Sequence, residues 1–220
     1  GKHFPYYLGQ SLFKFLGVFI FSMLIKVSNK WKKAEEEKRN AELSFLKAQV
    51  NPHFLFNTLN SIYSLSITEG AGETAAGIIK LSDMMRYISS ASSQKFVSLA
   101  KELDYIRNYI ELQKNRFGNT IKITYTVNGN TEGKLIAPLM LISFVENAFK
   151  HGVNPEEDSD IKIQIQISEN VLELQVFNNK VNIFYKEELT SGLGIENTSN
   201  RLKLIYPDKH VLKIENAAKE

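Results

Sequence analysis

The sequence predicts an α+β protein in which a helical hairpin precedes an α/β sandwich, with a transmembrane or membrane-proximal helix at the N-terminal end. The prediction rests on how the spacing of apolar residues changes along the chain. An apolar stretch comes first, apolar residues then recur at helical spacing as far as Phe117, and alternation with a period of two residues follows. We therefore assign residues 1–27 to a membrane helix, residues 28–117 to a linker helix and a helical dimerisation region, and residues 118–220 to the sandwich.

The composition is that of a folded, globular chain. Of the 220 residues, 43% are hydrophobic and 23% are charged, which excludes a disordered protein. The net charge of +3 is too small, and the basic residues are too dispersed, for a nucleic-acid-binding surface. Cysteine is absent, which excludes disulfides, thiolate zinc sites and cysteine nucleophiles and fits a reducing compartment. The chain begins at Gly1 and its first methionine is Met23, so we expect a fragment or a processed chain.

The apolar stretch from Leu8 to Val27 is long enough to cross a bilayer as a helix. Lys14 interrupts it, but this residue lies toward the upstream end and could extend to the interface. A basic cluster with a tryptophan follows and is typical of the cytoplasmic side of a membrane; its members are Lys26, Lys30, Trp31, Lys32 and Lys33. We expect a membrane anchor with the remainder in the cytoplasm. A buried core helix or a surface-lying amphipathic helix is the alternative.

Three helical stretches follow the apolar segment. Residues 29–66, 74–90 and 99–116 have the composition and the apolar spacing of helices. The segment 69–72 contains two glycines and separates the first stretch from the second. Two long helices joined by a short glycine-containing turn form a helical hairpin. Two hairpins from two chains would complete a four-helix bundle, so we expect a homodimer.

Alternating apolar residues predict the strands of the sandwich, and two strands form an antiparallel hairpin across a turn at Glu169 and Asn170. A very apolar stretch between the first and second strands predicts a buried helix. The strands are expected at 121–125, 161–167, 171–176 and 211–214, and the helices at 137–151 and 195–206. Strands and helices segregated in this way favour one sheet covered on one face by helices.

His53 is the first candidate for chemistry. It lies in QVNPHFLFNTLN directly after Pro52, which disturbs helical hydrogen bonding or opens a new helix. Asn57 lies one helical turn after His53 and hence on the same face. A neutral imidazole is a nucleophile, and a usual pKa of roughly 6.5 leaves it largely neutral in the cytosol. The residues alone leave open whether His53 is reactive or is a partly buried structural histidine.

A polar cluster ends the apolar run LMLISFVENAFKHG. Its members are Glu146, Asn147, Lys150 and His151. An asparagine oxygen suits Mg²⁺ that is shared with phosphate oxygens. A lysine can neutralise phosphate charge, and a carboxylate can orient a water molecule or act as a base. The residues alone leave two interpretations open: a nucleotide site, or a structural feature such as an ion pair between Glu146 and Lys150.

A Gly-x-Gly pair, Gly192 and Gly194, precedes the last predicted helix. Backbone amides at the start of that helix could receive phosphates, although such a pair alone also fits an ordinary turn. Residues 179–191 before it lack glycine and regular spacing, which is typical of a loop.

Taken together, these segments resemble the LytS/YehU-type sensor histidine kinases, in the same order and over residues 41–215. NPHFLFNTLN is similar to the phosphoacceptor motif of that family, which implies that His53 accepts a phosphoryl group. The stretch Val97–Phe117 is similar to the segment that leads into the family's ATPase domain. FVENAFKHG resembles the family's asparagine box, and GLGIENTSNRLKLIYP resembles its second glycine box.

The resemblance implies that residues 118–220 form an ATP-binding catalytic domain of the Bergerat type. It makes Asn147 the Mg²⁺ ligand and Glu146 a catalytic residue. The nucleotide would be bound by Asn147, Lys150, His151, Asn178, Gly192 and Gly194.

Two positions depart from the commonest histidine kinases. Asn178 stands where an aspartate usually receives the adenine amino group, and no glycine follows in its box. An amide oxygen can still accept that hydrogen bond, without the assistance of a charge. Phe54 stands where an acidic base often follows the histidine, so the base is Glu146 or there is none.

We therefore expect a homodimeric sensor kinase of the cytoplasmic membrane. It would use Mg-ATP to phosphorylate His53 and would pass the phosphoryl group to an aspartate of a response regulator, with no nucleic-acid partner. The alternative is a pseudokinase, a dimeric scaffold that binds partners without ATP turnover. The departure at Asn178 favours the pseudokinase, and the intact cluster from Glu146 to His151 opposes it. A Bergerat ATPase of the chaperone or repair type would not explain NPHFLFN.

Overall fold

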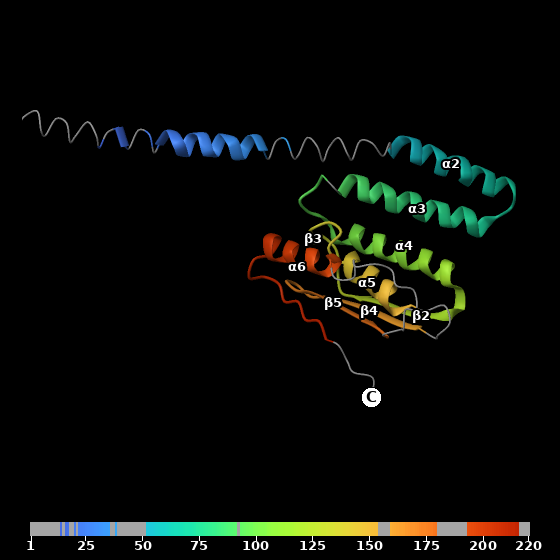
Figure 1. The fold of residues 1–220 in the computed structure, drawn as a ribbon. Coiled ribbons are helices and arrows are strands. Elements are labelled where there is room, and N and C mark those ends of the chain that lie inside the picture. The colour runs from blue at the N-terminus through green and yellow to red at the C-terminus, as the bar shows by residue number, and fades with distance from the viewer. Residues whose placement is uncertain are drawn as a thin grey trace, which may run out of the picture. The chain divides into compact units, whose positions relative to one another are not determined.

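The structure is a computed structural model. It describes residues 52–91, 93–153, 159–179 and 193–215, and in the N-terminal region residues 14, 16–17, 20, 22–35 and 38. The chain divides into two compact units, residues 1–55 and residues 56–220 (Figure 1), and each is considered by itself.

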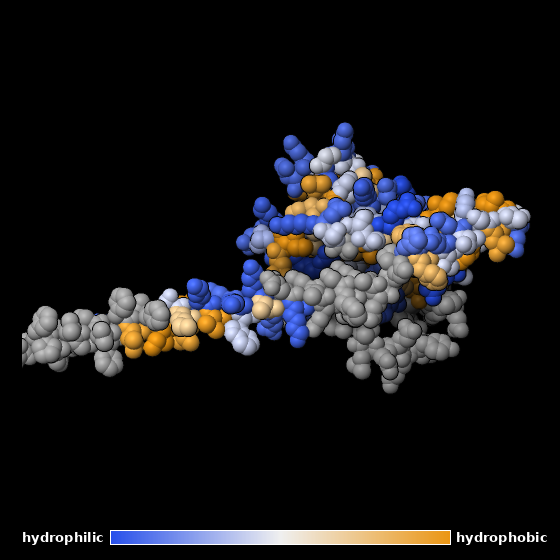
Figure 2. Space-filling model, turned by 90° about the horizontal axis from the view of Figure 1, so that it is seen from above, coloured by the Kyte–Doolittle hydropathy of each residue, from blue (hydrophilic) through white to orange (hydrophobic). Residues whose placement is uncertain are grey.

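The first unit is helical and solvent-exposed over residues 22–35. Along this helix in Figure 2, orange apolar side chains give way to blue hydrophilic ones, as the basic cluster predicts. Within the described part of the chain, no helix is long and apolar enough to cross a membrane. Part of the predicted span at Leu8–Val27 lies outside the described residues, and the expected membrane helix is not confirmed.

A helical hairpin begins at the boundary between the first and second units. Helix α2 (Pro52–Thr68) and helix α3 (Gly72–Ala91) are joined by a turn in which Gly70 adopts φ 71°. A positive φ is readily adopted only by glycine, which explains why the chain reverses there. The predicted break between the two helices is therefore confirmed.

Helix α4 (Leu99–Phe117) packs along α3 and also belongs to the main hydrophobic core. Lys80 on α3 forms an ion pair with Glu111 on α4 at 2.5 Å. The buried face of α4 lies in the same core as the sheet; its members include Leu99, Leu103, Ile106 and Ile110. Helix α4 and the sheet thus share one hydrophobic core, in which the apolar stripe of α4 packs on the sandwich.

The main sheet has three strands in the order β2-β4-β5. Strand β2 (Ile121–Asn128) is parallel to β4 (Ser159–Ile167), and β4 is antiparallel to β5 (Leu172–Asn178). In β4 every second residue is buried, so that one face of the strand contributes isoleucines to the core. Figure 1 shows α4, helix α5 (Ile142–Gly152) and helix α6 (Leu193–Ile205) on one side of this sheet. The predicted α+β fold and the β4–β5 hairpin are confirmed.

Two expected elements differ from the structure. The helix predicted from Ala137 begins only at Ile142, because Leu139 adopts φ 55° and interrupts helical geometry. No strand forms over Val211–Ile214, where the described backbone has no regular secondary structure. Two short strands, β1 (Val97–Ser98) and β3 (Leu135–Ile136), pair antiparallel and were not predicted.

Candidate functional site

Helix α5 carries the polar cluster Glu146, Asn147, Lys150 and His151. Its apolar face points into the core; the buried residues are Ile142, Val145, Ala148, Phe149 and Gly152. Glu146 and Lys150 are exposed, whereas Asn147 and His151 are half-buried. Successive residues of an α-helix are about 100° apart, so Glu146 and Asn147 point in different directions. The cluster therefore has two parts rather than one.

Glu146 lies on the flank of α5 that faces α4. Phe149 on the same flank makes an edge contact with Tyr109 of α4, with ring centroids 5.5 Å apart. Burial, followed by the negative charge of Glu146, raises the pKa values of Tyr105 and Tyr109 to about 12. Desolvation by neighbouring side chains also raises the pKa of Glu146 itself. A carboxylate with a raised pKa is a stronger proton acceptor, which suits a general base.

Asn147 and His151 lie about one turn apart on the other flank of α5. Burial, and then the charge of Lys150, lowers the pKa of the His151 imidazole. His151 is consequently neutral at neutral pH and offers one hydrogen-bond donor and one acceptor. The polar groups on this flank are thus an amide and a neutral imidazole, both of which can contact a nucleotide without adding negative charge.

The end of α5 lies directly against the end of β5. A Cβ atom placed on the buried Gly152 would be 2.5 Å from Cβ of Asn178 and 3.0 Å from its Cγ and Nδ2. Nδ2 of Asn178 donates a hydrogen bond to the carbonyl oxygen of Asn179 at 3.1 Å. Because this bond uses the amide nitrogen, the oxygen Oδ1 of Asn178 is the atom that can accept a hydrogen bond from a ligand.

The glycine pair and the candidate phosphoacceptor occupy other elements. Gly194 lies in the first turn of α6 and is exposed, and Gly192 lies outside the described residues. A Cβ at Gly194 would have nothing within 4 Å, so packing does not require a glycine there. His53 lies at the start of the described part of α2 and is exposed; it belongs to the first unit, and the other site residues belong to the second.

The segment from Ala137 to Leu141 positions the start of α5, and the sequence analysis did not identify it. Ala137 N donates to the hydroxyl of Tyr206 at 2.8 Å. Arg201 of α6 donates to the carbonyl oxygen of Pro138 at 2.8 Å. On the side of α4, the amides of Leu139 and Leu141 donate to Glu102 at 2.9 and 3.2 Å.

The position of Glu102 on its helix is the signal that could have revealed this role. Glu102 follows Leu99 by one turn and precedes Ile106 by one turn, and both neighbours are buried. A charged residue on the apolar face of an amphipathic helix requires buried partners.

The donor set around Asn147 limits what kind of metal it could hold. Among the described residues, no three His, Cys, Asp or Glu side chains gather into a metal-binding cluster. A cation held by Asn147 could take phosphate oxygens and water as further ligands. Mg²⁺ bound together with a nucleotide suits such a site, because Mg²⁺ keeps several waters and few protein ligands.

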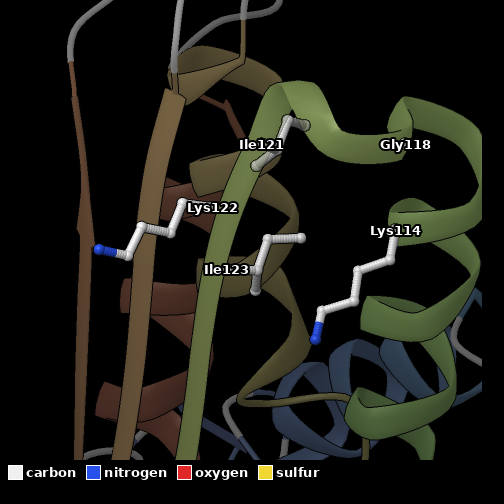
Figure 3. Close-up of a pocket in the computed structure, with 5 residues that line it drawn as sticks. All are labelled: Lys114, Gly118, Ile121, Lys122 and Ile123. Atoms are coloured by element: carbon white, nitrogen blue, oxygen red, sulfur yellow. The ribbon is translucent and has the colours of Figure 1, made fainter.

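A pocket of about 490 Å³ lies elsewhere, between the C-terminal end of α4 and strand β2 (Figure 3). Its lining residues are Lys114, Gly118, Ile121, Lys122 and Ile123. In Figure 3 Lys114 points toward β2, whereas Lys122 points to the opposite side of that strand. None of the residues proposed to bind the nucleotide lines this pocket. Residues 154–158 and 180–192, which follow α5 and β5 along the chain, lie outside the described residues.

Comparison with known proteins places the chain among histidine kinases. The histidine kinase family model matches residues 41–121. Sensor protein LytS of Enterococcus faecalis is 27% identical over 190 residues, which cover 81% of this chain and 32% of the relative. An uncharacterized sensor-like histidine kinase of Staphylococcus epidermidis is 31% identical over 185 residues, which cover 78% of this chain and 35% of the relative. Sensor protein kinase HptS of Staphylococcus aureus is 29% identical with the same coverage. The chain thus spans about a third of the length of these curated relatives.

Proposed function

The chain belongs to the LytS-type sensor histidine kinases, and we propose that it uses Mg-ATP to phosphorylate its own His53. The phosphoryl group would then pass to an aspartate of a response regulator. One observation carries the proposal: the C-terminal end of α5 lies against Asn178 at the end of β5. The candidate Mg²⁺ ligand Asn147 and the candidate adenine acceptor are therefore carried by two elements that meet.

Each residue of the site has a chemical task in this proposal. Asn147 supplies one oxygen to Mg²⁺, and Lys150 neutralises phosphate charge. Oδ1 of Asn178 accepts a hydrogen bond from the adenine amino group. When bound, Mg²⁺ would supply positive charge that offsets the charge of the phosphate oxygens. Catalysis would consist mainly of positioning, since phosphoryl transfer requires little covalent chemistry from the protein.

His53 is the nucleophile in the proposed reaction. A ring nitrogen of the neutral imidazole forms a bond to the γ-phosphorus while the bond from that phosphorus to the bridging oxygen breaks, and ADP leaves. Glu146, whose pKa is raised by desolvation, can accept the proton that the imidazole loses. The exposure of the His53 side chain supports access by a nucleotide-bearing domain and, later, by a response regulator.

We extend the proposal to a homodimer anchored in the cytoplasmic membrane. The hairpin presents large apolar side chains to solvent on α2 and α3; among them are Ile62, Leu65, Leu81 and Ile88. Figure 2 shows orange surface at the right-hand end of the molecule, where the turn between α2 and α3 lies in Figure 1. An exposed apolar helical surface of this kind favours pairing with a second hairpin.

The second candidate is the pseudokinase, which the amide at Asn178 favours over the usual carboxylate. A neutral hydrogen bond to adenine is weaker than a charge-assisted one. The two functions make different predictions for ATP turnover.

Incubation of the chain with γ-labelled ATP and Mg²⁺ separates these functions. A kinase takes up label that is labile in acid and stable in base, as a phosphohistidine is. A pseudokinase takes up no label, whether or not it binds the nucleotide. Acid-stable label would contradict both, because it would indicate a hydroxyl acceptor.

A further inference from the structure

Glu102 is a completely buried acidic side chain, with 0% of its surface exposed. Its carboxylate accepts three hydrogen bonds, from the hydroxyl of Tyr87, the amide of Leu139 at 2.9 Å and the amide of Leu141 at 3.2 Å. All three donors are uncharged. A buried carboxylate is costly unless its oxygens are hydrogen-bonded, so these three contacts determine where Glu102 can lie.

Two of the donors belong to the backbone that leads into α5. Leu141 is the N-terminal cap residue of α5, and Leu139 holds φ 55°, a left-handed conformation that is unusual for leucine. Such a conformation persists only where its surroundings enforce it. Glu102 supplies that constraint from α4, and a negative charge is favourable beside the start of a helix. Glu102 therefore fixes the direction in which α5 begins.

The third donor belongs to the helical hairpin. Tyr87 lies on α3, and its ring also packs on Tyr105 of α4 with centroids 5.1 Å apart. Burial and the contact with Glu102 raise the pKa of Tyr87 far above its usual value, so the hydroxyl remains a hydrogen-bond donor at neutral pH. The same carboxylate oxygen, Oε2, accepts from Tyr87 and from Leu139. One atom thus joins the second helix of the hairpin to the segment that orients α5.

Helix α6 holds the same segment from another side. Arg201 donates to the carbonyl oxygen of Pro138, and the Tyr206 hydroxyl accepts from Ala137. The elements expected to contact the nucleotide, α5 and α6, therefore meet at residues 137–141, where Glu102 and Tyr87 also act.

We propose that Glu102 is a positioning residue for phosphoryl transfer, which ties α3 through the Tyr87 hydroxyl to the start of α5. The inference rests on the proposed function and concerns its regulation. A displacement of α3 by a signal would move the start of α5 and so change the rate of phosphoryl transfer.

Tyr87→Phe is the sharpest test, because it removes the hydroxyl and keeps the ring that packs on Tyr105. We expect the dissociation constant for ATP to change by less than about twofold. The rate of His53 labelling at saturating ATP should fall at least about fivefold, which corresponds to roughly 1 kcal/mol of barrier. A merely structural role would lower the melting temperature and leave this rate unchanged once the protein is folded. Tyr125→Phe is the matched control, since it removes a hydroxyl from half-buried Tyr125 on β2.

A second pair of variants tests whether the two residues act through one contact. Glu102→Gln keeps the shape of the side chain and removes its charge. If the contact is shared, the double variant with Tyr87→Phe labels no more slowly than the worse single variant. Independent, multiplicative effects would overturn the coupling.

The outcomes also separate this inference from the proposed function. A parent chain that takes no label overturns the proposed function, and this inference with it. A parent that labels, with Tyr87→Phe labelling equally fast, overturns the inference alone.

Discussion

Gly152 lies against Asn178 so closely that a Cβ atom at Gly152 would come 2.5 Å from the Cβ atom of Asn178. The glycine ends α5 and the asparagine ends β5. The backbone at Gly152 does not have a positive φ, so the requirement for glycine is one of space. This contact brings the helix that carries the polar cluster to the strand that carries the candidate adenine acceptor.

The substitution Gly152→Ala should therefore weaken nucleotide binding as well as stability. The added methyl group must displace Asn178 or the end of α5, and overpacking of this kind costs about 1–3 kcal/mol. Thermal unfolding and an ATP titration measure the two effects. Gly72→Ala is the control, because a Cβ at Gly72 has nothing within 4 Å. If Gly152→Ala binds ATP with unchanged affinity, Asn178 is not part of the nucleotide site.

Asn178 should contribute one hydrogen bond to adenine. Asn178→Leu removes an acceptor whose net contribution is about 0.5–1.5 kcal/mol, so ATP should bind several-fold more weakly and discrimination against GTP should decrease. Asn178→Asp should bind ATP as well as the parent or better, because the acceptor becomes charged. Nucleotide titrations of the three proteins test this, and equal ATP affinities would place adenine elsewhere.

Glu146 should lower stability at neutral pH while serving the reaction. Its pKa is raised above the usual 4.5 by desolvation. The neutral form of Glu146 therefore contributes favourably to the free energy of unfolding. This contribution is fully present below about pH 4.5 and is lost as the pH rises through the folded-state pKa. Glu146→Gln should accordingly raise the melting temperature at pH 7 but not at pH 4, and should slow labelling of His53. A melting temperature that falls equally at both pH values would contradict this account of Glu146.

The hairpin should contain the dimer interface. Ile62 and Leu65 are exposed and lie one turn apart on α2, so glutamates at both positions would place charges in a paired surface. Sedimentation should show a dimer for the parent and a monomer for the Ile62→Glu, Leu65→Glu variant. Leu204→Glu is the matched control, because Leu204 is 81% exposed on α6. If the hairpin variant sediments as the parent does, the bundle is not the interface.

The elements that the sequence predicted well are those whose pattern is local. The alternating isoleucines of Ile161–Ile167 indicate a strand because every second residue is buried. The parallel pairing of that strand with β2 was not predicted, since it depends on partners distant in sequence. The late start of α5 is of the same kind: an apolar run favours a helix from Ala137, but the contact of Leu139 with Glu102 imposes another backbone conformation.

For the candidate site, the sequence likewise singled out residues with a distinctive local pattern and missed those whose role depends on distant partners. Polar residues on an otherwise apolar helix stand out, so the cluster with Asn147 and His151 drew attention, but only the family resemblance implied that it binds a nucleotide. The position of Glu102 on the apolar face of its helix indicates buried partners, but no local pattern identifies those partners on α3 and before α5. Gly152 was part of a recognised motif, but its role depends on how closely β5 approaches, which no local pattern expresses.

The central claim is that His53 accepts the γ-phosphoryl group of ATP, and the most direct measurement is the labelling of three proteins with γ-labelled Mg-ATP. These are the parent, His53→Gln, and His210→Gln as a histidine control from the end of the second unit. We predict acid-labile, base-stable label in the parent and in His210→Gln, and none in His53→Gln, which should still bind ATP with parental affinity. Label in His53→Gln at the parental level would contradict the account, because another residue would then be the acceptor.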